Sequence, residues 1–393
     1  METSELIRPE DIDIAPLIAG LTRWVEFETP SERPDLIDLL LDDVEAAFDG
    51  LSVQRRRHAA KDGHGGMLEL HYAPEGSSGR PAVIMGHVDT VWAAGTLAVR
   101  PVRREGDRLF GPGIFDMKAG SYLATETLRR LAAATAPTPR PVTVLLTGDE
   151  ETGSYASRAV IEELARKAAF VLIPEPSFGP DIAVVTSRKG WGRFTLRAKG
   201  RSAHAGGNLA DGRSAIVEVA RHILDIESLT DFDGGTTFNI GTVRGGTRTN
   251  VVPAEAEIEI DMRFTAAAAG EAEVAAMLAR SPFDPDITLE VEGGLNRAPY
   301  ERTEAVERLY TASRALANAL GMALGETMRG GVSDGNLAAA TGVPVLDGLG
   351  CGGRGAHAID EQIDLATLAP RAALMHAMMV SKEFQLQALI IDR

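Results

Sequence analysis

Short apolar segments alternate with longer amphipathic segments in the first half of the chain, and this alternation constrains the fold more than any other sequence feature. Runs rich in β-branched residues predict buried strands at residues 81–85, 142–146 and 170–173. The helical spacing of apolar residues predicts helices at 117–133 and 154–167. Strands that alternate with helices form a largely parallel sheet covered by helices. The sequence therefore predicts an α/β fold whose strands end at one common edge, where ligands of such folds bind.

A different order of elements occupies residues 188–296. This order is strand, helix, strand, strand, helix, strand, which is the split βαβ motif. The six elements are predicted at residues 191–198, 213–226, 237–243, 256–264, 270–280 and 287–291. A segment of about a hundred residues with this order can form its own α+β sandwich. We therefore predict that residues 188–296 are an inserted domain.

The C-terminal part of the chain returns to the first pattern. We predict a helix at residues 303–320, a strand at 343–346 and a terminal helix at 365–384. The first domain is therefore expected to be discontinuous, with residues 1–187 and 297–393 folding together.

Composition excludes several classes of partner. The chain has 393 residues, with 40 Lys and Arg against 56 Asp and Glu, so its formal net charge of −16 disfavours nucleic acid and anionic membranes. The single cysteine, Cys351, can form neither an internal disulfide nor a thiolate cluster, so any metal ion must be bound by His, Asp and Glu. No apolar run approaches the roughly 20 residues of a membrane span. Residues 1–5 are acidic where a secretory signal is basic, which predicts a cytoplasmic protein.

Two polar residues follow the first predicted strand. His87 and Asp89 are two positions apart, so their side chains project to the same side of an extended segment. A metal-binding histidine needs an acceptor for its second ring nitrogen, and the carboxylate of Asp89 can supply one. A structural His–Asp pair would give the same pattern, so this motif alone leaves both interpretations open.

Carboxylates follow in the next segments. Asp116 lies in a glycine-rich turn that enters a helix, where it could bind a metal ion or cap the helix. Residues 149–151 are three consecutive carboxylates, whose mutual repulsion is relieved either by cations or by solvent. Glu175 lies between two prolines that fix the backbone, which suits a rigid turn as well as a ligand.

A histidine in a glycine-rich loop, His357, precedes the terminal helix and taken alone is typical of a surface residue. Together with the strand ends, it gives a set of two histidines and three carboxylates, with one further carboxylate left over. Such a set suits two zinc ions that share one carboxylate, and the remaining carboxylate suits a general base. We therefore predict a two-metal site.

The same motifs resemble the dizinc hydrolase family that includes acetylornithine deacetylase, succinyl-diaminopimelate desuccinylase, aminoacylase and bacterial glutamate carboxypeptidase. The resemblance extends over nearly the whole chain and rests on six motifs: Gly86-His87-Val88-Asp89, Asp116-Met117-Lys118, Glu150-Glu151, Pro174-Glu175-Pro176, Ser202-Ala203-His204-Ala205-Gly206 and the His357 segment. Residues 330–336 and 346–350 resemble the C-terminal signature of the glutamate carboxypeptidase branch.

The resemblance implies a role for each residue of the predicted two-metal site. Asp116 is expected to bridge the metal ions, with His87 and Glu175 completing one site and Glu151 and His357 the other. Glu150 is then the general base, which takes a proton from the metal-bridging water and delivers it to the leaving amine. Zinc is the expected metal, and manganese or cobalt could occupy the same ligands.

Further residues follow from the same resemblance. It implies a cis peptide bond after Asp116 and a homodimer formed through the inserted domain, with His204 reaching the neighbouring subunit's active site to stabilise the tetrahedral oxyanion. Asn250 and Arg263 match positions that hold the substrate's α-carboxylate, a task that suits the planar guanidinium of arginine.

The implied function is that of a dizinc hydrolase that cleaves an amide bond next to a free α-carboxylate and releases an amino acid, as a glutamate carboxypeptidase does. An N-acyl-amino-acid deacylase of the aminoacylase or deacetylase type would use the same machinery. A catalytically silent relative would be expected to lack the base or a ligand, whereas Glu150 and the five ligand residues are all present. A calcium-binding protein would favour ligands that are all oxygen, which two histidines do not provide.

Two positions depart from the family pattern. Ala358 follows His357 where a serine is usual, and Arg354 stands where a glycine or an aromatic residue is expected. We hypothesise that Arg354 lines the substrate pocket near the metal ions and favours an anionic group. Arg188 and Lys189 are secondary candidates for the same task.

Overall fold

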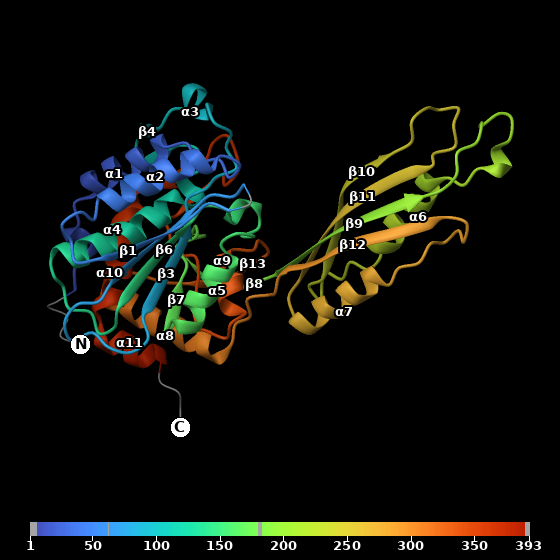
Figure 1. Ribbon diagram of the computed structural model, residues 1–393. Helices are drawn as coiled ribbons and strands as arrows, with labels where there is room; N and C mark the ends of the chain where they lie inside the picture. Colours follow the sequence, from blue (N-terminus) through green and yellow to red (C-terminus); the bar gives the residue numbers. More distant parts are fainter. Residues whose placement is uncertain (1–5, 62, 180–182, 390–393) are drawn as a thin grey trace. The chain divides into compact units, whose positions relative to one another are not determined.

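The computed structural model describes residues 6–61, 63–179 and 183–389 (Figure 1). The chain divides into two compact units, and each is described by itself. The first consists of Met1–Ser187, Arg302–Met328 and Ser333–Arg393, and the second of Arg188–Glu301 and Arg329–Val332. The acidic opening segment, residues 1–5, on which the expectation about a signal sequence rests, lies outside the described residues.

A mixed, mostly parallel sheet of six strands forms the centre of the first unit, in the order β1-β2-β6-β3-β7-β14. The last four strands of this order run parallel, while β1 and β2 form an antiparallel edge. The strands are β1 (Gln54–His58), β2 (Met67–Tyr72), β3 (Ala82–His87), β6 (Val142–Thr147), β7 (Phe170–Leu172) and β14 (Val345–Leu346). Every residue of β3, β6 and β7 is buried, and since successive side chains point to opposite faces, both faces of the sheet are covered. The predicted α/β fold is confirmed.

Helices cover this sheet (Figure 1), and all but one helix of four residues carry buried apolar side chains. In the first unit they are α1 (Ile14–Glu26), α2 (Pro34–Ala46), α3 (Thr96–Val99), α4 (Ala119–Ala133), α5 (Arg158–Lys167), α8 (Glu304–Ala319), α9 (Asp334–Ala339), α10 (Leu368–Val380) and α11 (Lys382–Leu389). Side-chain caps define several starts: Asp13 accepts the N–H of Ala15 at α1, and Thr303 accepts the N–H of Val306 at α8.

Two predicted helices differ from those observed. The terminal helix predicted at 365–384 is two helices, α10 and α11, because the backbone of Ser381 is extended and its hydroxyl oxygen accepts the N–H of Phe384 at 3.1 Å as a cap. The helix predicted to begin at residue 154 begins at Arg158. The preceding turn is held instead by Asp149, whose Oδ2 accepts the N–H of Ala156 at 2.7 Å.

A small antiparallel sheet links two distant segments of the first unit. Its order is β15-β16-β5-β4, with β4 (Arg103–Glu105), β5 (Arg108–Phe110), β15 (Gly353–Arg354) and β16 (Gln362–Asp364). The pairing of β16 with β5 places the loop that contains His357 beside the segment that leads to Asp116. A further two-stranded sheet joins β8 (Val184–Arg188) to β13 (Glu326–Arg329).

The second unit is a four-stranded antiparallel sheet with two helices, in the strand order β10-β11-β9-β12. Its elements are β9 (Gly190–Lys199), α6 (Ala215–Glu227), β10 (Thr237–Gly245), β11 (Glu255–Phe264), α7 (Ala267–Leu278) and β12 (Thr288–Arg297). Alternate residues of β11 are buried with α6 and α7, and the residues between them carry charged groups on the other face. The predicted strand and helix order of this segment is confirmed.

Across the described residues, no helix combines the length and the apolar character that crossing a membrane requires.

Candidate metal centre

The ends of three neighbouring parallel strands meet at the predicted edge of the sheet. His87 is the last residue of β3 and pairs in register with Thr147, the last residue of β6. Glu175 follows β7, in a segment that packs closely on α4: a Cβ at Gly120 would lie 1.7 Å from the carbonyl oxygen of Pro174. Only glycine permits this approach, so the sequence of α4 helps to place Glu175 at the same edge as His87.

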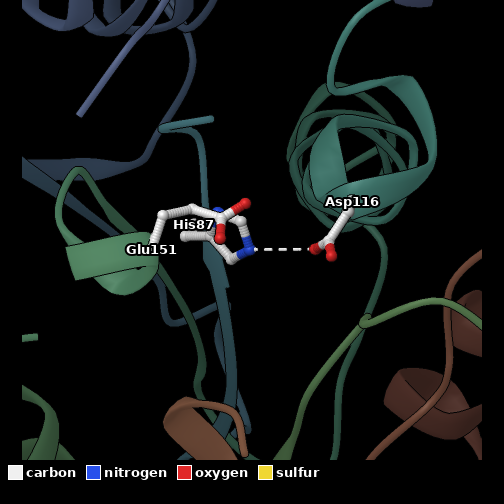
Figure 2. A group of neighbouring side chains, drawn as sticks. All are labelled: His87, Asp116 and Glu151. Atoms are coloured by element: carbon white, nitrogen blue, oxygen red, sulfur yellow. Dashed lines mark ion pairs between the residues drawn. The ribbon is translucent and has the colours of Figure 1, made fainter. Parts of the chain in front are cut away.

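Three of the predicted ligand residues lie within reach of one ion. The ligand atoms of His87, Asp116 and Glu151 are all within 4.8 Å of one another, and Figure 2 shows the three side chains. His87 Nε2 is 3.3 Å from Asp116 Oδ1, the contact drawn as a dashed line in Figure 2. Asp116 comes from a short π-helical turn, η3 (Ile114–Lys118), whose backbone is non-helical at Asp116 and Met117. The peptide bond between these two residues is cis, as the family resemblance implied.

The structure brings the other two predicted ligand residues to the same place. His357 Nε2 lies 3.4 Å from Asp116 Oδ2 and 3.2 Å from the carboxylate of Glu151. Glu175 Oε1 lies 3.9 Å from His87 Nε2. Asp116 therefore faces one histidine with each of its two oxygens, which is the arrangement expected of a carboxylate shared by two metal ions.

The hydrogen bonding of the His87 ring suits a metal ligand. Its Nδ1 lies 3.0 Å from the backbone carbonyl of Asp89 and donates a hydrogen bond there, which leaves the lone pair on Nε2. Nε2 is buried, and within the described part of the chain it forms no hydrogen bond. A buried acceptor without a donor is costly, and a cation would satisfy it. The donor set of two imidazoles and three carboxylates therefore fits two divalent cations of the zinc type.

Asp89 does more than the sequence suggested. Its carboxylate lies 3.4 Å from His87 Nδ1, and the same carboxylate accepts the backbone N–H groups of Glu150 and Glu151 at 3.2 and 3.1 Å. The hydroxyl of Ser31 also donates to it at 2.7 Å. Asp89 is fully buried and thus connects the β3 histidine to the acidic turn η4 (Glu150–Thr152). Ser31 was missed in the sequence because it lies in no motif.

Electrostatic effects at the centre favour a bound cation. Burial opposes ionisation of Asp116, but the nearby imidazoles of His357 and His87 outweigh it and hold the pKa of this carboxyl well below its usual range. Hydrogen bonds with Asp116 and Glu151 raise the pKa of His357 to about 10. Burial raises the pKa of Glu151. The three carboxylates of the predicted ligand set outnumber its two imidazoles, so the site attracts positive charge.

The candidate oxyanion donor, His204, lies in the second unit in an exposed loop. Its Nδ1 accepts backbone N–H groups from Gly206 and Gly207, each at 3.1 Å, so the neutral ring carries its proton on Nε2 as a donor. The backbone carbonyl of Asn250 accepts the N–H of Ala205 at 3.0 Å, which ties the segment of Asn250 to this loop.

The two candidate arginines already have partners. Arg263 on β11 binds Asp261 through two parallel hydrogen bonds of 2.8 and 2.9 Å, and its guanidinium lies over the ring of Trp191. Arg354 on β15 has 69% of its side chain exposed and lies 3.5 Å from Asp360. Roles in substrate binding for both stay predictions.

The family follows from comparison with known proteins. The sequence pattern of peptidase family M20/M25/M40 matches residues 83–381. The chain belongs to this family. It is 32% identical over 310 residues to carboxypeptidase G2 of Pseudomonas sp. (strain RS-16), covering 78% of this chain and 74% of that protein. M20-family members are metallohydrolases, and the chain is an enzyme of this kind.

Solved structures of two peptidases share the fold. An aminopeptidase of Bacillus cereus matches with a TM-score of 0.76 and 23% identity, over 95% of this chain and 99% of that one. A dinuclear metal-binding M20 peptidase of Bacillus subtilis matches with a TM-score of 0.62 and 15% identity, over 92% and 99% of the two chains. At these identities the likeness establishes the fold alone.

Proposed function

We propose that this M20-family enzyme is a two-metal hydrolase that cleaves an amide bond next to a free α-carboxylate and releases an amino acid. The observation that carries the proposal is the position of Asp116, whose two oxygens face His87 and His357 at 3.3 and 3.4 Å. The likeness to a protein named carboxypeptidase G2 supports the substrate class.

Five residues would hold the two cations, and their mixture of imidazole and carboxylate groups suits zinc. His87 and Glu175 would hold one cation, Glu151 and His357 would hold the other, and Asp116 would contact both. When bound, such cations polarise a carbonyl group and raise the acidity of water. Glu150 takes the proton of the attacking water and passes it to the leaving amine. The Nε2–H of His204, contributed by the neighbouring subunit, donates to the developing oxyanion. Asn250 and Arg263 hold the α-carboxylate.

The test is a panel of N-acyl and N-aminoacyl amino acids that varies the C-terminal residue among glutamate, aspartate, neutral and basic residues. Each substrate is paired with its C-terminal amide, and the released amino acid is quantified with the zinc-loaded protein. We expect release from the free acids and little from the amides. Equal release from the free acids and the amides would contradict a site that depends on the α-carboxylate. Broad release from N-acyl amino acids with neutral side chains would indicate a deacylase.

The Arg354→Gly variant tests which side chain the pocket favours. If Arg354 contacts an anionic substrate group, its loss should raise KM for a substrate with C-terminal glutamate about tenfold, the effect of one charged hydrogen bond, and leave a neutral substrate nearly unchanged. Arg104→Gly is the control, because Arg104 is an exposed arginine of the same small sheet. Equal effects of Arg354→Gly on both substrates would refute this role.

We also propose that the second unit forms a homodimer. Strand β10 is an edge of its sheet, and α6 packs beside it. Apolar side chains are exposed on both elements, with Leu224 of α6 74% exposed and Val243 of β10 62% exposed. An unpaired edge strand beside apolar side chains is a surface that a second copy can cover.

The Leu224→Glu variant tests the dimer surface. Loss of a well-packed interface residue costs about 2 kcal/mol, which weakens dimerisation about 30-fold. Light scattering coupled to gel filtration should show dissociation at concentrations where the wild type is dimeric. Leu278→Glu on α7 is the control, with an apolar side chain that is 47% exposed on the other helix. A Leu224→Glu protein that stays as dimeric as the control would contradict this surface.

A further inference from the structure

A buried carboxylate next to the metal centre has no role in the function proposed above. Glu361 is 2% exposed, and its two oxygens accept four hydrogen bonds. Oε1 accepts the backbone N–H groups of Phe115 and Asp116 at 2.9 and 3.0 Å. Oε2 accepts the N–H of Gly113 and the indole N–H of Trp92, both at 2.7 Å. Each oxygen thus serves two donors, which fixes the orientation of the carboxylate.

The four donors belong to segments that carry metal ligands. Gly113 and Phe115 lie in the turn that carries Asp116, and Asp116 itself is one of the donors. Trp92 lies five residues after His87, in the loop that leaves β3. The carboxylate therefore holds the turn of Asp116 and the loop after His87 at a fixed separation.

The backbone of Glu361 extends the same connection to a third ligand. Its N–H donates to the carbonyl of Ala358 at 3.1 Å, which closes the turn immediately after His357. Its carbonyl accepts the N–H of Gly111 at 3.3 Å. His357 has a left-handed backbone with φ of 62°, a conformation that is strained for a non-glycine residue and persists only where neighbouring contacts impose it. Glu361 supplies part of that constraint.

We propose that Glu361 is a positioning residue that holds the segments of His87, Asp116 and His357 in the geometry that two divalent cations require. This inference rests on the proposed two-metal function. Glu361 acts through the backbone of the ligand segments and binds no cation itself, because both of its oxygens are occupied by N–H donors. A role in general stability alone would predict no specific effect on metal affinity.

The Glu361→Gln variant separates these roles. Glutamine has the same shape, but its NH2 group replaces one oxygen and faces two N–H donors, so the turn of Asp116 or the loop of Trp92 must shift. Loss of a group that orients metal ligands typically lowers metal affinity 10–100-fold. We expect a loss of this size in Zn2+ affinity, measured by competition with a chromogenic chelator, and an altered visible spectrum of the Co2+-loaded protein.

The matched control is Glu218→Gln in the second unit. Glu218 is 1% exposed and also accepts two backbone N–H groups, those of Phe283 and Asp284 at 2.6 and 3.2 Å. The Glu218→Gln variant therefore measures the cost of removing a buried carboxylate that binds backbone N–H groups in a unit without any of the proposed ligand residues. We expect this variant to lose stability in thermal unfolding and to keep wild-type Zn2+ affinity and the wild-type Co2+ spectrum.

Trp92→Phe provides a second measurement that does not depend on whether Glu361→Gln folds. It removes one of the four donors and keeps an aromatic ring, so we expect Zn2+ affinity to fall about 3–10-fold, less than in Glu361→Gln because the three backbone donors still hold the carboxylate. Wild-type affinity and spectrum in Glu361→Gln, or in Trp92→Phe if the first variant is unfolded, would overturn the proposal, as would an equal loss of affinity in Glu218→Gln. A wild-type protein that does not bind two Zn2+ ions would instead refute the proposed function.

Discussion

The Glu150→Gln variant is expected to lose turnover while it keeps two bound metal ions. Glutamine matches glutamate in shape but cannot accept a proton, and a positioned general base contributes about 10²–10⁴-fold to the rate. The loss should appear in kcat with little change in KM, since Glu150 is proposed to act on the attacking water. Steady-state kinetics on the best substrate of the panel, together with metal analysis by mass spectrometry, measure both quantities.

Glu151→Gln is the matched control for this prediction. The backbone N–H groups of Glu150 and Glu151 are held by the same carboxylate, that of Asp89, and the side chain of Glu151 lies 3.2 Å from His357. We therefore expect the Glu151 variant to lose metal ions as well as activity. A Glu150→Gln protein that keeps more than a tenth of the wild-type kcat, or that loses metal as the Glu151 variant does, would contradict the assignment of the base.

Removal of the metal ions is expected to abolish amide hydrolysis and to destabilise the folded protein. The buried site places several carboxylates together, and bound cations offset their mutual repulsion. A site saturated at about a hundred times its Kd stabilises the fold by about 2.7 kcal/mol. Dialysis against a chelator should therefore lower both the rate of amino-acid release and the temperature of thermal unfolding.

Restoration of activity identifies the metal class. Zn2+, Mn2+ or Co2+ should restore hydrolysis, and Ca2+ should not, because His87 and His357 provide nitrogen ligands that a hard cation does not favour. The control is the same dialysis without chelator. Full activity in a protein shown by metal analysis to be free of metal would rule out the two-metal mechanism.

Much of the fold follows from local sequence patterns. Apolar runs and helical spacing placed the strands of the parallel sheet and the order of elements in the second unit, because both signals depend on residues close in sequence. The boundaries were less accurate where a side chain stops a helix. Ser381 divides α10 from α11, and Asp149 holds a turn where a helix was expected, and each does so through hydrogen bonds that apolar periodicity does not encode.

The sequence by itself determined which residues could bind metal ions, because His87, Glu151 and Glu175 lie at or just after the ends of strands that must coincide in a parallel sheet. Only histidine and carboxylate ligands are available in this chain. Only the tertiary structure decided how these residues are held. Glu361 and Asp89 act on backbone N–H groups, which every residue except proline carries, so no motif marks their partners. Contacts between Ser31 and Asp89, or between Trp92 and Glu361, join positions far apart in the chain, and they exist only because folding buries both partners together.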